Sequence, residues 1–128
     1  MDYLFLAGRV LFGGFFASAG FMHFKGLEML TGYAQSKKVP MANVAVIGTG
    51  LMLFAGGLGI ILGAYTNISL WLIIIFLAVS TPMMHAFWTV TDPMAKMGET
   101  VNFKKNLALL GGALMLLSLA TPWVMLVL

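Results

Sequence analysis

The chain has 128 residues, of which 61% are hydrophobic and 9% are charged, and its mean hydropathy is +1.01. Because an ordinary soluble domain carries about 25% charged residues, this composition excludes a soluble globular protein, a disordered chain and a free-standing nucleic-acid binder. The net charge of +3 reflects only seven basic and four acidic residues, so it does not predict nucleic acid as a partner. The sequence has no cysteine, which excludes disulfides, a thiol nucleophile and a cysteine-ligated metal.

Four segments are long and apolar enough to cross a membrane, since a transmembrane helix needs about 20 mostly apolar residues. Each must be helical, because backbone polar groups in lipid have to be satisfied within the segment. The sequence therefore predicts an all-α membrane protein, one domain over residues 1–128 that forms an antiparallel bundle of four transmembrane helices. The expected spans are residues 4–22, 42–63, 68–88 and 107–128.

The first span contains the only charged residue within the four spans, Arg9. Steps from Arg9 through Gly13 and Gly20 to His23 follow one helical stripe, so we expect this stripe to face another helix. Arg9 has two interpretations. Its side chain either snorkels or bonds a helix end, or it binds an anionic or carbonyl-bearing ligand near the outer side of the membrane.

The loop after the first span carries Leu27, Leu30 and Ala34 at helical spacing. This pattern predicts a short interfacial helix in loop one. In the second span, Gly59 and Gly63 lie four residues apart, which is typical of close helix packing. The same small residues offer a face to a partner subunit as the alternative.

The third span ends in a group of residues that can form hydrogen bonds or take up protons. Thr81, His85, Trp88 and Asp92 step by four, three and four, so they share a face if the helix continues that far. We expect Asp92 to pair with His85 and to orient its ring. Trp88 is interpreted either as a flat face for an aromatic headgroup or as a member of the interfacial aromatic belt.

The dipeptide Met22-His23 recurs as Met84-His85, and helices one and three run parallel in the expected bundle. This faint repeat predicts that His23 and His85 lie at the same membrane end. Two histidines without a carboxylate or cysteine at ligand spacing do not predict a metal site, and they do not favour haem.

The third loop and the sequence after it carry two asparagines and most of the remaining charge. Asn102 and Asn106 are four apart, and we expect them to cap helix four while facing the His85 group. Lys104 and Lys105 are expected to face lipid phosphates. Because all the lysines fall in loops one and three, loops one and three should be cytoplasmic, with both termini outside a plasma (inner) membrane.

A set of residues along nearly the whole chain resembles the DoxX family of small four-helix membrane proteins. These residues are Arg9, Gly20, Val39-Pro40, His85-Ala-Phe-Trp88 and Asn102-Phe-Lys-Lys-Asn106. The family is named after a subunit of an archaeal thiosulfate:quinone oxidoreductase, and other members associate with redox enzymes or with quinone and catechol detoxification. Many members carry an acidic residue at about the place of Leu53 and Lys at the place of His23, so this chain departs from the family pattern twice.

Three functions follow as hypotheses. The resemblance implies a membrane subunit of an oxidoreductase or respiratory complex that contributes to a quinone site, with His85, Asp92, Trp88 and His23 around the ring. Without a flavin or iron–sulfur motif, the chain would not be a self-sufficient enzyme. The alternatives are a purely structural accessory subunit, and a small-molecule transporter or receptor anchored by Arg9. Membrane lipids and either other membrane subunits or further copies of the chain are the expected partners.

Overall fold

The computed structural model describes residues 2–119 and 121–125, and this part of the chain is helical, without a strand. Three of its helices are long and apolar enough to cross a membrane, which confirms the all-α membrane class. The elements are α1 (Tyr3–Lys25), α2 (Leu27–Ser36), α3 (Ala42–Leu62), α4 (Thr66–Met84), the 3-10 helix η1 (Phe87–Thr89) and α5 (Pro93–Leu117).

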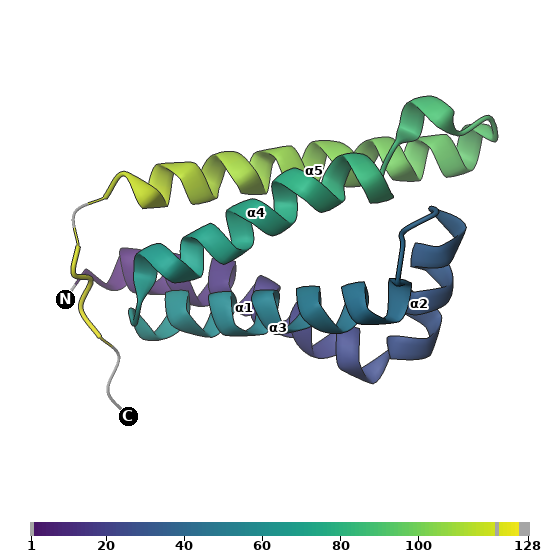
Figure 1. The fold of residues 1–128 in the computed structure, drawn as a ribbon. Helices are drawn as coiled ribbons and strands as arrows, with labels where there is room; N and C mark the ends of the chain where they lie inside the picture. Colours follow the sequence, from purple (N-terminus) through teal and green to yellow (C-terminus); the bar gives the residue numbers. More distant parts are fainter. Residues whose placement is uncertain (1, 120, 126–128) are drawn as a thin grey trace.

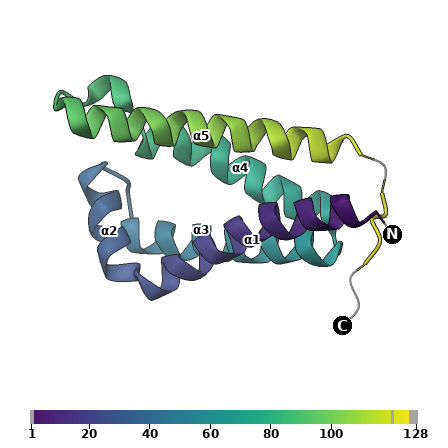
Figure 2. The same cartoon turned by 180° about the vertical axis from the view of Figure 1, so that it is seen from behind.

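The long helices pack in chain order, α1 against α3, α3 against α4, and α4 against α5. The start of α1 and residues 121–125 lie at one end of the molecule, while α2 lies at the opposite end beside the start of α3 (Figures 1 and 2). The short helix predicted in loop one is therefore present as α2. Its position places it over the ends of the long helices, where it helps to enclose the cavity described below.

Close contact between α1 and α3 depends on glycine. A methyl group at Gly13 would lie 2.6 Å from the carbonyl oxygen of Gly57, and one at Gly20 would lie 2.5 Å from the backbone nitrogen of Phe54. Real side chains cannot approach so closely, so only glycine allows the two backbones to pack at this distance. The prediction that the stripe from Arg9 to His23 faces another helix is confirmed.

Helix α4 ends at Met84, three residues before the short helix η1 begins. The prediction that one helical face carries Thr81, His85, Trp88 and Asp92 is therefore wrong. Pro82 lies in the last turn of α4, where it lacks a backbone N–H and its ring crowds the preceding turn. The chain leaves the helix at His85, whose backbone N–H still donates to the carbonyl of Thr81 at 2.9 Å.

Helix α5 begins at Pro93, well before the expected start at residue 107. Asp92 is its N-cap, and the carboxylate accepts a hydrogen bond from the backbone N–H of Ala95 at 2.9 Å. Proline at the first helical position suits this start, because its missing N–H would be unsatisfied there in any case. The residues assigned to a loop thus form the first turns of a long helix.

The same helix ends at Leu117, so the expected span over residues 107–128 is helical only as far as this residue. Residues 126–128 of that span lie outside the described residues, as does residue 120. Pro122 cannot continue a helix and disfavours helical backbone in the residue before it. The described residues of this segment return toward the N-terminal end, where Trp123 is buried with its ring edge against Phe5, at 5.1 Å between centroids.

Candidate functional site

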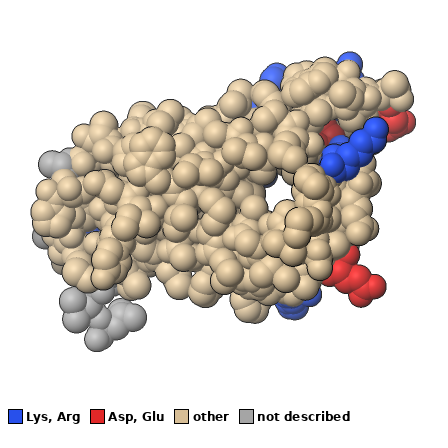
Figure 3. Space-filling view, in the orientation of Figure 1, with Lys and Arg blue, Asp and Glu red and all other residues tan. Residues whose placement is uncertain are grey.

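A cavity of about 460 Å³ lies at the α2 end of the molecule. Both histidines line it, so the prediction that His23 and His85 lie at the same end is confirmed. Figure 3 shows an opening that passes through the molecule between α3 and the α4–α5 pair, next to α2. The remaining wall residues are mostly apolar, namely Leu30, Ala34, Val39, Pro40, Ala45, Val46, Phe76, Val79, Met83 and Met84, with Tyr33, Thr49, Ser80 and Asn106 as polar members.

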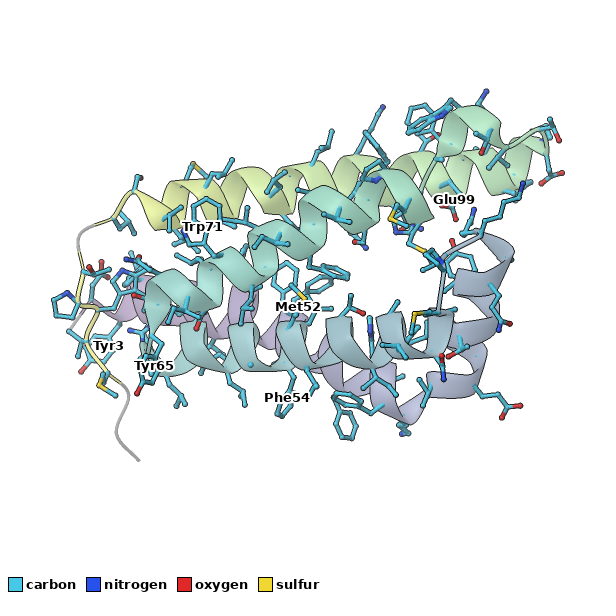
Figure 4. The ribbon with its side chains drawn as sticks, viewed as in Figure 1. Tyr3, Met52, Phe54, Tyr65, Trp71 and Glu99 are labelled. Atoms are coloured by element: carbon cyan, nitrogen blue, oxygen red, sulfur yellow. The ribbon has the colours of Figure 1, made fainter. Side chains whose placement is uncertain are left out.

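The ring of His85 is held by a carboxylate that the sequence analysis did not include, Glu99. The Nδ1 atom of His85 lies 2.8 Å from Oε2 of Glu99. The hydroxyl of Tyr33 donates to Oε1 of the same carboxylate at 2.8 Å, and Nζ of Lys37 lies 4.0 Å from Oε2. Figure 4 shows Glu99 on the side of α5 that faces α2. This cluster therefore joins α2, α5 and the end of α4 at the cavity.

Tyr33 and Glu99 lie outside the apolar spans, and their contacts set the charge of each group. Burial raises the pKa of Tyr33 to about 12, and the hydrogen bond with Glu99 and its negative charge act in the same direction. Burial also raises the pKa of the Glu99 carboxyl, but the hydrogen bonds from His85 and Tyr33 and the charges of His85 and Lys37 lower it overall. At neutral pH, Glu99 is therefore an anion and Tyr33 a neutral donor.

These contacts fix the proton positions on His85. An ionised carboxylate can only accept, so Nδ1 of His85 carries a proton that it donates to Glu99. The other ring nitrogen, Nε2, is then an acceptor in the neutral imidazole and a donor in the imidazolium. The carboxylate keeps the ring in one orientation. When its ring is protonated, His85 can deliver a proton from Nε2 to a ligand in the cavity.

His23 is fixed in a different way. Its Nδ1 lies 3.0 Å from the carbonyl oxygen of Val46 and 3.1 Å from the hydroxyl oxygen of Thr49. A carbonyl only accepts, so Nδ1 carries the proton, while the Thr49 hydroxyl donates to the carbonyl of Ala45 at 2.7 Å. In neutral His23 the Nε2 atom is therefore an acceptor. Both histidines that line the cavity are thus held through Nδ1, and in the neutral imidazole Nε2 of each is an acceptor.

The asparagines lie within α5 and not at its start, so the prediction that they cap this helix is wrong. The reason is that Asp92 begins the helix well before them. Asn106 is buried, lines the cavity and donates from Nδ2 to the hydroxyl of Thr81 at 3.2 Å. Its carbonyl oxygen remains an acceptor within this polar layer. Asn102 is half-buried one turn earlier on α5.

Trp88 and Asp92 are not among the residues that line the cavity. The ring of Trp88 is 56% exposed and contacts the rings of Phe87 and Phe103 edge-on, with centroids 5.3 and 5.7 Å apart. Asp92 caps α5, and the carboxylate bonded to His85 in the described structure is that of Glu99. The expected His85–Asp92 pair is therefore wrong, because α4 ends too early to align them.

Arg9 lies at the opposite end of the molecule and is only 2% exposed. Its Nε donates to the carbonyl of Ile60 at 3.0 Å, and one terminal nitrogen donates to the carbonyl of Ile61 at 2.9 Å. The guanidinium also lies over the rings of Phe5 and Trp123, at 5.7 and 5.8 Å from the centroids. Arg9 thus satisfies the C-terminal carbonyls of α3, as the helix-end interpretation expects.

The remaining predicted residues, Lys104 and Lys105, lie outside the cavity lining. Lys104 is exposed, and Nζ of Lys105 lies 5.6 Å from the ring centroid of Phe15 on α1. Across the residues that the structure describes, no group of three or more His, Cys, Asp or Glu could hold a metal ion.

The sequence analysis missed Glu99 and Tyr33 because it assigned residues 89–106 to a loop. One signal was available. Asp92 followed directly by Pro93 is a typical helix start. A helix that begins there and runs back alongside α4 brings Glu99 to the end of α4, where His85 lies. No spacing rule links Tyr33 to Glu99, since they are far apart in the sequence and meet only through packing.

Comparison with known proteins found one family. The family model described as DoxX matches residues 4–86, a range that includes both histidines and ends just after α4. No curated protein and no solved structure matches the chain.

Proposed function

The chain belongs to the DoxX family of membrane proteins, and from this premise we propose that it binds a quinone ring in its cavity. In this proposal it acts as a membrane subunit of an oxidoreductase or respiratory complex, and a partner subunit supplies or removes the electrons. The observation that carries the proposal is that His23 and His85 line one largely apolar cavity, each with its ring fixed through Nδ1. Its volume of about 460 Å³ lies within the range of about 300–1,000 Å³ typical of small-molecule sites.

The chemistry of a quinone fits two histidines held in this way. Its carbonyl oxygens become hydroxyls on reduction, and each oxygen then needs a proton. In this proposal protonated His85 donates from Nε2 to one oxygen, and Glu99 holds the ring in place during the transfer. The other oxygen takes its proton from water, and neutral His23 then accepts a hydrogen bond from that hydroxyl through the ring nitrogen that is not bonded to Val46. Apolar walls cover the ring faces, as a flat aromatic ligand requires.

We further propose that all four long helices cross the membrane as an antiparallel bundle, with α2 in the interface. The start of α1 and the end of α5 lie at the same end of the molecule, as four crossings require (Figure 1). The lysine-bearing end is then cytoplasmic and the termini lie outside a plasma (inner) membrane, with Lys104 and Lys105 near lipid phosphates. Helix α5 has 25 residues and is about 37 Å long at 1.5 Å per residue, which is enough to cross a hydrocarbon core of about 30 Å.

The contacts of Arg9 bear on the alternatives. A transporter or receptor anchored by Arg9 needs a free guanidinium, whereas here the group is bonded to the end of α3. A structural accessory subunit makes no use of the two histidines, so the quinone titration described next separates it from a quinone-binding subunit. Either kind of subunit can form oligomers.

The test is a quinone titration of the purified protein in lipid nanodiscs. Replacing His85 with Ala should weaken binding about tenfold or more, because a hydrogen bond to a charged group contributes about 1.5–3 kcal/mol. His23→Ala should weaken it to a smaller extent. Lys105→Ala is the control, since Lys105 is exposed and lies outside the cavity lining. Unchanged affinity in His85→Ala would favour the accessory function instead.

A further inference from the structure

We propose that the ligand carries a long hydrocarbon tail that leaves the cavity sideways, between α3 and α4, into the membrane. The inference rests on the proposed function, because it assumes that the ring of a quinone occupies the cavity. It adds the route of entry and the class of ligand, which is a tailed, membrane-resident quinone and not a water-soluble ring.

The cavity is a passage and not a closed pocket. Figure 3 shows the opening between α3 and the α4–α5 pair, so the cavity is open to the flanks of the helices. Val79 and Met83 both line the cavity, and they are 56% and 42% exposed. In the proposal these two residues of α4 form part of the rim of the opening.

The surface around this opening is apolar. Neither α3 nor α4 contains Asp, Glu, Lys or Arg. Large apolar side chains are exposed on the outer faces of both helices, among them Ile47 and Leu51 on α3 and Ile75 on α4. Lipid hydrocarbon is the solvent that such a surface requires, so a ligand that uses the opening arrives from the bilayer.

The depth of the opening suits a lipid with a polar ring. Val79 lies about 7.5 Å from the end of α4 at Met84, and Val46 lies about 6 Å from the start of α3, at 1.5 Å per residue. The opening is therefore just inside the membrane boundary at the lysine-bearing end. A ring held at this depth leaves its tail pointing toward the bilayer centre.

The volume of the cavity favours a tail that lies outside it. About 460 Å³ is near the lower end of the range of about 300–1,000 Å³ typical of small-molecule sites. That space accommodates a substituted ring, but it does not accommodate a long isoprenoid chain in addition. The polar groups His23, Thr49 and His85 hold the ring, and Val79 and Met83 contact the first part of the tail.

The experiment compares two quinones that share one ring, one with a methyl substituent and one with a long isoprenoid tail, each titrated into nanodiscs. Val79→Trp narrows the opening. We expect it to weaken binding of the tailed quinone tenfold or more and to leave the methyl quinone within about twofold of wild type. Ile75→Trp is the matched control, one turn away on α4, 50% exposed and outside the cavity lining.

The outcomes separate the two proposals. If both quinones bind the wild type and Val79→Trp affects them equally or not at all, the tail does not leave by this opening and the inference is overturned. If neither quinone binds the wild type, the proposed function fails, and the inference fails with it. Retained binding of the methyl quinone shows that the Val79→Trp protein is folded.

Discussion

Replacing Arg9 with Gln should lower the free energy of unfolding by about 3 kcal/mol or more, since each hydrogen bond from a charged group contributes about 1.5–3 kcal/mol. Arg9 makes two such bonds, to the carbonyls of Ile60 and Ile61 at the C-terminus of α3. The partial negative charge of a helix C-terminus strengthens them. The substitution leaves those buried carbonyls without a charged donor, and a shorter amide cannot reach both.

The measurement is unfolding of the purified variants in detergent, with Lys105→Gln as the control for removing an exposed positive charge. Arg9→Lys should be intermediate, because an ammonium lacks the planar fork that reaches two carbonyls at once. Normal stability of Arg9→Gln combined with loss of small-molecule uptake would contradict the structural role and support the transporter hypothesis.

Replacing Glu99 with Gln should lower the free energy of unfolding by about 1–2 kcal/mol at neutral pH, after allowance for partial exposure of the cluster. The carboxylate bonds His85 and Tyr33 and attracts Lys37, so it ties α2 to α5 and to the end of α4. A neutral amide keeps the shape of Glu99 but weakens the hydrogen bonds from His85 and Tyr33 and loses the attraction to Lys37. The cavity wall formed by α2 should therefore loosen.

The pH dependence follows from the lowered pKa of Glu99 in the folded protein. A carboxyl with a lowered folded pKa stabilises the fold fully above its unfolded pKa of about 4.3, and the contribution is lost as the pH falls through the folded value. Wild-type stability should therefore fall on acidification below about pH 4, by more than that of Glu99→Gln. Glu28→Gln, which removes an exposed acid from α2, should behave as wild type. Parallel pH curves for wild type and Glu99→Gln would show that this cluster does not contribute.

The apolar helices could be predicted from the sequence because hydropathy and helical spacing act locally. The step pattern from Arg9 to His23 identified the face of α1 that packs on α3, and the repeated Met-His pair placed both histidines at one end. These features depend on the helix period and on chain direction. Neither requires knowledge of which distant residues meet.

The end of α4 and the course of α5 could not be predicted from hydropathy alone. Hydropathy measures affinity for lipid, so it assigned the polar first turns of α5 to a loop and the apolar residues after Leu117 to a helix. The local signals that decide these bounds are Pro82, the Asp92-Pro93 pair and Pro122. The partnership of His85 with Glu99 followed from those bounds, because only a helix that begins at Pro93 brings this carboxylate back to the ring.

Photolabelling in nanodiscs tests the central claim, that the cavity holds a quinone ring, most directly. The probe is a tailed quinone with an azide on its ring, and labelled residues are located by mass spectrometry. Labels should fall on cavity residues near His23, Val46 and His85, and an excess of unmodified quinone should prevent them. Labels confined to exposed residues on the far faces of the helices, such as Leu11 and Leu114, and unaffected by competition would contradict it.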